Sequence, residues 1–488
     1  MNARTLRIRS CAAAVAAVLA MHTAGARQEF DRTKPPVPGK APELRVPAWT
    51  KSTLANGADV IVSEKHDLPL VSFSVTLIGG ANQFEPADRT GLAGITAAML
   101  SEGTASRDGE ALSNALQLLG TSVSASVGGE SGSMSFVSTA GRFEQTLEIL
   151  ADMLTNPVFP AESLERIKGQ RLVALEQGKA QPGTIRSRVF PRVLYGTEHP
   201  YGRFSTEASV KAITRDDVIA FHRAYFLPGR ALVTVVGDVD ADTVKPAIEK
   251  ALEGWRRGGD RPAFRYPAVP AHGKTTIYLV DKPGAAQSSV MIGHPGPPRN
   301  TPDYYALQVM NTMLGGMFQS RLNANIREEK GYSYGVGSGF DYGKGPGSFS
   351  ASGNIVSDKT DEALIEFMKE LRGILGERPI TDDELATARA SLVQRLPSAF
   401  GSVAGVNNAI TTIWRQGLPE TYYQEYAKAV GAVTKGDVLR VARKHLDLDR
   451  LAIVIVGDRA SIEGPLKETG IAPIVRLDLE GRLQAAEQ

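Results

Sequence analysis

The chain has 488 residues, of which 42% are hydrophobic and 22% are charged, and its formal net charge is +2. This near-neutral balance gives no reason to expect nucleic acid as a partner, and no apolar stretch after the N-terminus is long enough to span a bilayer. The length exceeds that of one ordinary domain and predicts about three units.

The N-terminus has the composition of an export signal. Three arginines within the first nine residues precede a short apolar run, Ala12–Met21, and Ala24–Ala26 then fits a small-x-small cleavage site. We therefore expect residues 1–26 to be a signal peptide and the mature chain to be exported to a periplasm. The single cysteine, Cys11, lies inside this segment, so we expect no disulfide and no thiol chemistry in the mature chain.

The first folded half begins after a proline-rich leader. Two predicted strands, Asp59–Val62 and Val71–Ile78, are followed by Thr90–Gly103, which predicts a helix because it lacks proline and is rich in alanine. Its apolar residues form one stripe that we expect to be buried, namely Leu92, Ile95, Met99 and Leu100.

Further elements complete this half. Ser122–Gly128 predicts a strand of small residues. A helix with Thr214 as its N-cap and a strand of β-branched residues, Leu232–Val236, close the half. Between the strand Ser122–Gly128 and this closing helix lies an amphipathic helix whose apolar positions are Phe143, Leu147, Leu150 and Leu154.

The second half of the chain repeats the first. The block Ile213–Val218 recurs as Val433–Val438, and the block Leu232–Asp238 recurs at the same offset as Ala452–Asp458. Two separate blocks at one offset, which we call the repeat offset, indicate a duplicated domain. The matching elements of the second half are the strands Thr275–Val280 and Ser288–Ile292, a helix with Leu364, Phe367, Met368 and Leu371, and a closing helix capped by Thr434.

The alternation of strands and helices predicts an α+β fold with two homologous halves, each an antiparallel-rich sheet with helices packed on one face. The glycines and prolines of Trp255–Gly273 indicate the connection between the halves. The predicted segments are a signal peptide at 1–26, a leader at 27–48, an N-terminal domain at 49–255, a linker at 256–273, a C-terminal domain at 274–470 and a tail at 471–488.

The predicted helix Thr90–Gly103 carries a family resemblance. Gly91-Leu92-Ala93, Met99-Leu100 and Gly103-Thr104 fit the frame G-L-A-H-x-x-E-H-M-L-x-x-G-T of the pitrilysin family of zinc peptidases. That family includes insulin-degrading enzyme and the mitochondrial processing peptidase. The resemblance covers nearly the whole mature chain, and it also implies two duplicated halves in one subunit.

The residues that bind zinc in that frame are absent here. H-x-x-E-H places two imidazoles and a carboxylate on one helical face, but the matching positions hold Gly94, Ala97 and Ala98, which cannot bind a metal or transfer a proton. The resemblance implies a third ligand at Ala174 or Leu175. Glu176 lies next to them, so a shift of the alignment would restore that ligand alone.

The histidines give no replacement for this motif. No two of the seven lie within five residues of each other, so neither H-E-x-x-H nor H-x-x-E-H occurs. The alternative is a zinc site built from histidines that are scattered in the sequence. His199 and His222 match landmarks of the family, and we expect both to have structural roles in turn and helix packing.

The second half contains two further residues that the resemblance singles out. In the family, an arginine and a tyrosine seven residues later reach the substrate beside the zinc, and Arg327 and Tyr334 have this spacing. A guanidinium and a phenol can both donate hydrogen bonds to a scissile carbonyl and to the oxyanion that forms from it. The alternatives are a surface arginine with a packing tyrosine, and Tyr332 in place of Tyr334 if the alignment slips.

Two stretches are candidates for contacting a peptide. Ser122–Gly128 aligns with the family's substrate-binding edge strand, and its central residues Ser124, Ala125, Ser126 and Val127 are small enough for an extended peptide to add as another strand. An ordinary edge strand blunted by serine and glycine is the alternative. The glycines of Gly335–Gly347 fit either a mobile loop beside the substrate or a set of turns.

These observations predict the zinc-less subunit of a periplasmic pitrilysin-like peptidase, inactive alone. The resemblance implies a partner that carries H-x-x-E-H and the zinc, with this chain binding extended peptides and contributing Arg327 and Tyr334. One alternative is a non-catalytic scaffold or peptide-binding subunit of an envelope complex, like the related core proteins of respiratory complexes. The other is an independent metallopeptidase with an atypical metal site.

Overall fold

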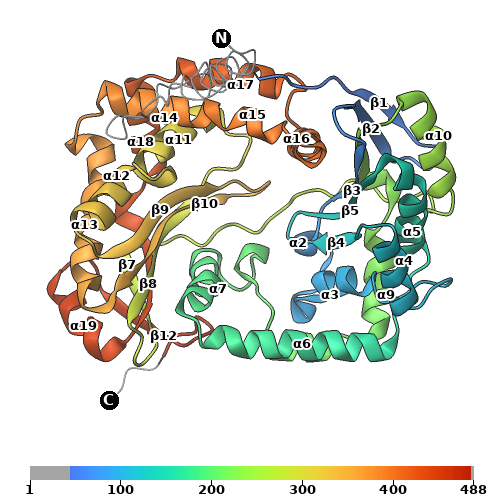
Figure 1. The fold of residues 1–488 in the computed structure, drawn as a ribbon. Coiled ribbons are helices and arrows are strands. Elements are labelled where there is room, and N and C mark those ends of the chain that lie inside the picture. Colours follow the sequence, from blue (N-terminus) through green and yellow to red (C-terminus); the bar gives the residue numbers. More distant parts are fainter. Residues whose placement is uncertain (1–43, 485–488) are drawn as a thin grey trace, which may run out of the picture. The chain divides into compact units, whose positions relative to one another are not determined.

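The computed structural model of the protein describes residues 44–484. The predicted signal peptide with Cys11, most of the leader and the last four residues lie outside this range. The described residues form two six-stranded sheets, one in each half of the sequence (Figure 1). The strands of the N-terminal sheet are β1 (Thr50–Thr53), β2 (Asp59–Glu64), β3 (Leu70–Ile78), β4 (Ser124–Val127), β5 (Ser131–Thr139) and β6 (Ala231–Gly237). Those of the C-terminal sheet are β7 (Thr276–Asp281), β8 (Gln287–Gly296), β9 (Ser333–Asp341), β10 (Gly347–Val356), β11 (Ala452–Gly457) and β12 (Ile474–Leu477).

The two sheets repeat one topology. The order β2-β6-β3-β5-β4 in the first sheet corresponds to β7-β11-β8-β10-β9 in the second, with β1 added beside β2 and β12 beside β7. The β2–β6 and β7–β11 pairs are parallel, whereas the other three pairs of each shared set are antiparallel. The predicted α+β fold with two homologous, antiparallel-rich halves is therefore confirmed.

Helices accompany each sheet. Those of the first half are α2 (Ala81–Phe84), α3 (Leu92–Met99), α4 (Gly109–Leu118), α5 (Phe143–Thr155), α6 (Ala161–Lys179), α7 (Pro182–Tyr195), α8 (Glu207–Ala212), α9 (Arg215–Tyr225) and α10 (Ala241–Ala251). Those of the second half are α11 (Tyr304–Asn311), α12 (Arg321–Asn323), α13 (Thr360–Arg372), α14 (Asp382–Gln394), α15 (Leu396–Ala399), α16 (Val403–Gln416), α17 (Tyr422–Ala432), α18 (Lys435–His445) and α19 (Arg459–Glu468). Two π-helical segments, η5 (Thr312–Gly316) and η6 (Ala324–Glu329), flank α12.

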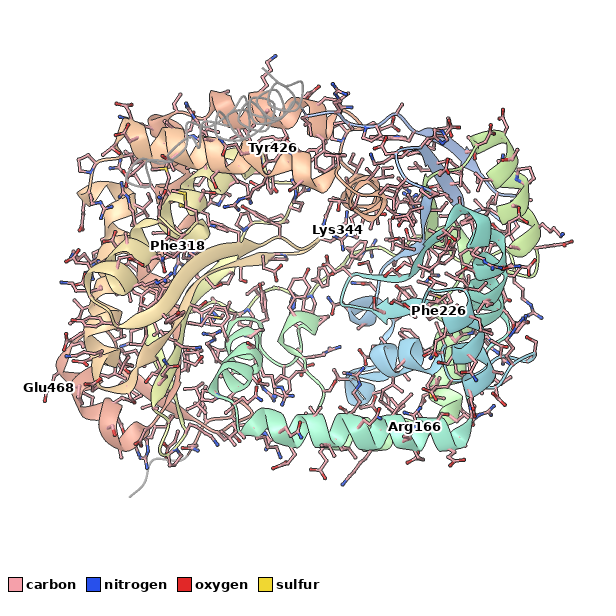
Figure 2. All side chains as sticks on the ribbon, viewed as in Figure 1. Arg166, Phe226, Phe318, Lys344, Tyr426 and Glu468 are labelled. Carbon is pink, nitrogen blue, oxygen red and sulfur yellow. The ribbon has the colours of Figure 1, made fainter. Side chains whose placement is uncertain are left out.

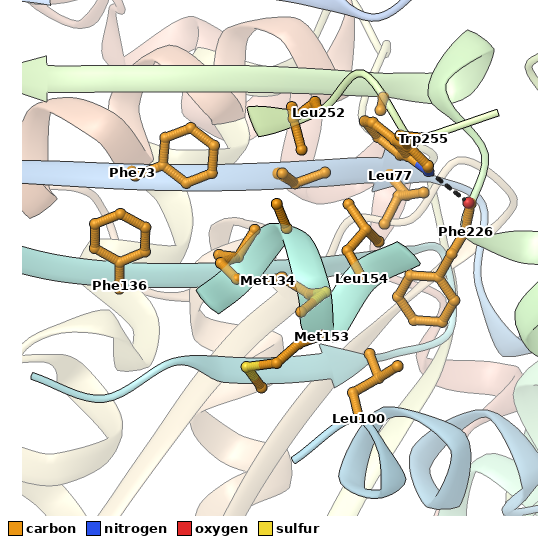
Figure 3. Close-up of a cluster of buried hydrophobic side chains, with 14 of the residues drawn as sticks. Phe73, Leu77, Leu100, Met134, Phe136, Met153, Leu154, Phe226, Leu252 and Trp255 are labelled. Atoms are coloured by element: carbon orange, nitrogen blue, oxygen red, sulfur yellow. Dashed lines mark hydrogen bonds between the residues drawn. The ribbon is translucent and has the colours of Figure 1, made fainter. Parts of the chain in front are cut away.

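The core of the first half lies between the N-terminal sheet and its own helices (Figure 3). Because side chains alternate across a strand, Val71, Phe73 and Val75 of β3 point into this core, where Phe73 stacks on Phe136 of β5 with ring centroids 5.3 Å apart. Trp255 is also buried here, and its Nε1 donates a hydrogen bond to the carbonyl oxygen of Phe226 at 2.8 Å. Trp255, the last residue of the predicted N-terminal domain, is thus part of the core.

Each half also contributes one helix to the sheet of the other half. Helix α7 packs Ile185, Val189 and Phe190 against strands of the C-terminal sheet, and α16 packs Val406 and Ile410 against the N-terminal sheet. In Figure 1, α6 leads from the helices of the first half to α7 beside the second sheet. Both exchanged helices are 14 residues long and occupy corresponding places in the two halves.

The helix predicted at Thr90–Gly103 is shorter in the structure. It begins at Leu92, because Gly91 has a φ of 110°, a left-handed conformation that favours glycine and stops the helix from extending backwards. It ends at Met99, and the chain continues in turns to Gly103. The predicted apolar stripe, from Leu92 to Leu100, is buried throughout.

The predicted helix caps are present. Thr214 Oγ1 accepts a hydrogen bond from the backbone N–H of Asp217, and Thr434 Oγ1 accepts the equivalent bond from Asp437. The segment 471–484, predicted as a tail, includes β12, which adds to the C-terminal sheet in parallel with β7. Between residues 44 and 484, no helix combines the length and the apolar character needed to cross a membrane.

Candidate functional site

A cavity of about 1190 Å³ lies on the open face of the N-terminal sheet. The residues of β3 that alternate with its core side chains face this cavity, as do the corresponding residues of β4 and β5. We call it the hydroxyl cavity, because its sheet side is formed by Ser72, Ser74, Ser124, Ser126, Ser133 and Ser135. Hydroxyl groups both donate and accept hydrogen bonds, so this surface suits a polar, uncharged backbone.

The opposite wall of the hydroxyl cavity is α16. Asn407, which is buried, fixes this helix on the sheet, because its Nδ2 donates to the carbonyl oxygens of Ser72 and Thr234 at 3.3 Å and its Oδ1 accepts from Ser74 Oγ at 2.7 Å. Arg415 is the one charged residue among those that line the cavity. Its Nη1 donates to Ser131 Oγ at 3.3 Å, whereas its buried Nε has no described partner.

Strand β4 forms one edge of the N-terminal sheet. It pairs with β5 through Ser124–Val127 and has no described strand on its other side. Ser124 and Ser126 are exposed, and Ala125 and Val127 are half-buried. The structure therefore places the four predicted peptide-contacting residues at a free edge, where an extended chain can complete the backbone hydrogen bonds.

Helix α3 lies beside β4 and lines a second cavity. This cavity has a volume of about 520 Å³, and Gly94, Ala174 and Leu175 all contribute to its wall. The structure thus brings together two of the places that the family resemblance assigned to zinc ligands. Ala97 is buried and Ala98 half-buried on α3, and neither lines the cavity.

The residues around this second cavity do not fit a zinc ion. Glycine, alanine and leucine stand at the predicted ligand positions, and Glu176 instead points to solvent, where it pairs with Lys179 at 2.7 Å. The charged residues of the wall are Glu85, Arg171, Arg188 and Arg203, so guanidinium groups predominate, and we call it the arginine cavity. Within residues 44–484, no cluster of three histidine, cysteine, aspartate or glutamate residues could hold a metal.

Glu85, the one carboxylate of this wall, is already bonded inside the protein. Its Oε1 accepts a hydrogen bond from the backbone N–H of Gly91, at the start of α3. Burial raises the pKa of Glu85, against the opposing effects of the backbone amides of Gly91, Leu92 and Ala93 and of Arg203. The carboxylate therefore caps α3 rather than presenting a metal ligand.

A network of hydrogen bonds at Glu130 connects the two halves. Its Oε1 accepts from the hydroxyl of Tyr266 at 2.5 Å and also from that of Tyr201, and its Oε2 accepts from the backbone N–H of Lys344 at 2.9 Å. Lys344 lies at the tip of the β9–β10 hairpin (Figure 2). The glycine-rich segment Gly335–Gly347 is therefore anchored to the first half. Burial at this network raises the pKa of Tyr266 to about 12.

The two histidines that resemble family landmarks lie inside the first half. His199 Nδ1 accepts a hydrogen bond from the backbone N–H of Tyr201 at 3.1 Å, and the ring stacks between Tyr195 and Tyr266. His222 Nε2 lies 2.9 Å from the carbonyl oxygen of Leu154. Burial lowers the pKa of both imidazoles, so both are neutral packing groups near pH 7.

Arg327 and Tyr334 are in contact in the second half. Arg327 lies on η6, and its guanidinium carbon is 5.4 Å from the ring centre of Tyr334, on β9, and 4.4 Å from that of Phe318. Tyr334 is 90% exposed and Phe318 60%. The pair lines neither the hydroxyl cavity nor the arginine cavity, and the Tyr334 side chain projects from the described surface.

Tyr332, the alternative to Tyr334, is held differently. Its hydroxyl donates to a carboxylate oxygen of Glu362, and this contact raises the pKa of Tyr332. Arg415, Asn407 and Glu130 could not be predicted as site residues, because a single polar residue on a helix or turn does not indicate what it faces. The period-two serines of β3 and β5 were the available signal for the hydroxyl cavity.

Comparison with known proteins places the chain among peptidases and their relatives. Residues 60–195 match the family model described as insulinase (peptidase family M16), and residues 212–392 match the one described as peptidase M16 inactive domain. An uncharacterized zinc protease of Streptomyces coelicolor is 24% identical over 86% of this chain and 90% of its own length. The non-peptidase homolog YmxG of Helicobacter pylori is 23% identical over 82% of this chain and 92% of its own.

A solved structure is similar over most of both chains. The crystal structure of a peptidase M16 inactive domain from Pseudomonas fluorescens covers 84% of this chain and 98% of its own, with 28% sequence identity and a TM-score of 0.76. The two family models together match more than half of the 488 residues, and the second extends from Ala212, the last residue of α8, into the C-terminal half. The chain belongs to peptidase family M16.

Proposed function

We propose that this chain is an exported, periplasmic peptide-binding subunit without a hydrolytic centre of its own. It acts with a second M16 subunit that carries H-x-x-E-H and zinc. Extended peptides bind along β4, in the hydroxyl cavity, and the partner performs the hydrolysis. The relative in Helicobacter pylori that is named a non-peptidase homolog supports a family role of this kind.

The observation that carries the proposal is the arrangement of Arg327 and Tyr334. The two side chains are stacked, and Tyr334 is 90% exposed although a tyrosine gains stability from burial. A phenol and a guanidinium held together at the surface can both donate hydrogen bonds to a developing oxyanion in a neighbouring subunit. In the complex, both groups contact the peptide at the zinc of the partner.

Kinetics of the purified complex with the H-x-x-E-H subunit test this role. Removing one donor to an oxyanion lowers kcat by about 100-fold to 1000-fold. We expect losses of this size for Arg327→Ala and Tyr334→Phe, with assembly unchanged in size-exclusion chromatography. Full turnover of both variants would remove the proposed catalytic contribution.

Tyr332→Phe distinguishes the two tyrosines. This variant deletes the same hydroxyl group two residues earlier, where the hydroxyl is bonded to Glu362 instead of exposed. A loss of turnover in Tyr332→Phe but not in Tyr334→Phe would transfer the role to Tyr332. Failure of the chain to form any complex with an H-x-x-E-H subunit would reject the two-subunit proposal.

A further inference from the structure

The arginine cavity has three arginines in its wall, and the loss of zinc ligands alone does not explain them. Its three arginines come from three separate elements, with Arg171 on α6, Arg188 on α7 and Arg203 just after the short helical turn Pro200–Gly202. Three cations from three consecutive elements in the wall of one cavity are electrostatically unfavourable unless an anion compensates for them. Helix packing alone gives no reason for it.

The charges of this cavity are only partly compensated within the protein. Arg203 donates from Nη2 to the carbonyl oxygen of Glu198 at 2.7 Å, and Glu85 is bonded to the start of α3. Among residues 44–484, neither Arg171 nor Arg188 has a described hydrogen bond or ion pair. Two guanidinium groups on the wall of a cavity of about 520 Å³ therefore remain available to a ligand.

The position of Arg188 is constrained by its surroundings. It is half-buried on α7, and its guanidinium lies over Gly178 of α6, where an added Cβ would come within 3.3 Å of Nη2. The absence of a side chain at Gly178 leaves room for this guanidinium. Since α7 is held on the C-terminal sheet by its apolar face, Arg188 is presented from a fixed helix.

The arginine cavity continues the proposed peptide site. Gly128, at the end of β4, lines both the hydroxyl cavity and the arginine cavity, and Val127 lines the latter as well. A peptide that extends along β4 therefore reaches the arginines at one end. The hydroxyl cavity is lined by neutral groups apart from Arg415, so the arginines provide the strongest charge along this path.

We propose that the arginine cavity binds a carboxylate, at the place that corresponds to the zinc of the catalytic frame, and thereby selects extended peptides with an acidic group at that end. Arg171 and Arg188 make the direct contacts, because a guanidinium can bind a carboxylate through two parallel hydrogen bonds. The carboxylate comes from an acidic side chain or from a free C-terminus. The peptide part of this inference rests on the proposed function, whereas the carboxylate site does not.

The first test uses glutarate as the probe and the purified full chain. Isothermal titration at low ionic strength should detect binding, and the double variant Arg171→Gln/Arg188→Gln should weaken it about tenfold or more. Arg142→Gln is the matched control, because Arg142 is an exposed arginine of the same half, outside the described cavities. Equal glutarate binding by the double variant, or no glutarate binding by the unmodified chain, would overturn the inference.

The second test uses four acetylated eight-residue peptides of serine, threonine and alanine. The first peptide has a free C-terminus and no glutamate. The second has an internal glutamate and an amidated C-terminus, and the third has a glutamine in place of that glutamate. The fourth is the amidated form of the first. We expect the unmodified chain to bind one or both acidic peptides about tenfold more tightly than the neutral ones. The double variant should bind all four alike, with the affinity of the neutral peptides.

The outcomes separate the two proposals. A preference for only one acidic peptide identifies the source of the carboxylate. Equal binding of all four peptides by the unmodified chain would overturn the inference and leave the peptide-binding function standing. Arginine-dependent binding of glutarate without binding of any peptide would support the carboxylate site and reject the peptide-binding function.

Discussion

The two sheets have the same strand order, but their exchanged helices cover them differently. When α7 and α16 are aligned from their first residues, Pro182 and Val403, Phe190 and Leu194 of α7 correspond to Thr411 and Arg415 of α16. Phe190 and Leu194 pack on the C-terminal sheet as apolar groups, with Phe190 at the border of a separate cavity of about 510 Å³, whereas Thr411 and Arg415 line the hydroxyl cavity. The duplicated fold thus has one face closed by packing and one face left open.

The strands beneath these helices also differ, with a polar residue under α16 where an apolar one lies under α7. Thr234 of β6 corresponds to Val454 of β11 at the repeat offset. Asn407 of α16 makes three hydrogen bonds to the two strands beneath it, β3 and β6. The corresponding residue of α7, Arg186, donates one, from Nη1 to the carbonyl oxygen of Val290 at 3.2 Å. The comparison indicates that polar residues on both layers keep a cavity open between them.

The largest loss of stability is expected from truncating Phe190, which packs on the C-terminal sheet. Phe190 is 3% exposed, and an added Cβ at Gly293 would lie 2.8 Å from its ring, so the two are closely packed. Phe190→Ala should lower the free energy of unfolding in urea by about 3–5 kcal/mol. Thr411→Ala, at the corresponding place beside the open cavity, should cost less than about 1 kcal/mol. Similar losses for both variants would contradict the contrast between the faces.

A smaller loss of stability is expected from removing the side chain of Asn407, which fixes α16 on the N-terminal sheet. Asn407→Ala removes the partner of Ser74 Oγ and leaves the buried carbonyl oxygens of Ser72 and Thr234 without this donor. The expected cost is about 2 kcal/mol, again measured by urea unfolding. Arg186→Met, which removes one bond at the corresponding position of α7, serves as the comparison. A neutral result for Asn407→Ala would mean that water replaces its bonds.

Replacing two polar residues of α16 with the apolar residues that α7 has at these positions should weaken peptide binding. The double variant Thr411→Phe/Arg415→Leu gives α16 the two residues that α7 has at these positions. The larger apolar side chains should fill the hydroxyl cavity and weaken binding of a neutral peptide at least about tenfold, or about 1.4 kcal/mol, in isothermal titration. Unchanged binding by a variant with an unchanged urea midpoint would place the peptide outside this cavity.

The smallest effect concerns pH and His222, which corresponds to Ala442 of the second half at the repeat offset. Burial lowers the pKa of His222 below its ordinary value of 6.5, so near that pH the unfolded chain binds a proton that the folded chain does not. Stability should therefore fall as the pH drops from 7.5 to 5.5. His199 and His294, whose pKa values are also lowered by burial, should contribute in the same direction.

The matched variant for this measurement is His222→Gln, whose amide can still donate to the carbonyl oxygen of Leu154. Its urea midpoint should decline less between pH 7.5 and pH 5.5 than that of the unmodified chain. The same decline in both proteins would assign the pH dependence to other groups.

Much of the fold could be predicted because its signals are local or repeated. The common offset of the two repeated blocks indicated the duplication, and Thr214 and Thr434 gave helix starts that the structure contains. The exchange of α7 and α16 could not be predicted, because an amphipathic helix shows that one face is buried but not which sheet buries it. The shortening of α3 followed from Gly91, whose backbone conformation the sequence does not specify.

The candidate site was predictable only in part. The family frame located Gly94 and the edge strand Ser124–Val127, which the structure places around adjoining cavities. Arg188 and Arg415 gave no signal, because single arginines on helices are common and usually solvated. Their role depends on which elements meet in space. The assignments of Arg327, Tyr334 and β4 to catalysis and peptide binding stay predictions.

The reciprocal exchange of helices also affects how the chain can be divided. If the backbone were cut within residues 256–273, the N-terminal fragment would retain α7 without the sheet it covers, and the C-terminal fragment would retain α16 in the same condition. Each piece would expose an apolar face whose complement lies on the other piece. We therefore expect two separately produced halves to refold only together, as in split-fragment complementation.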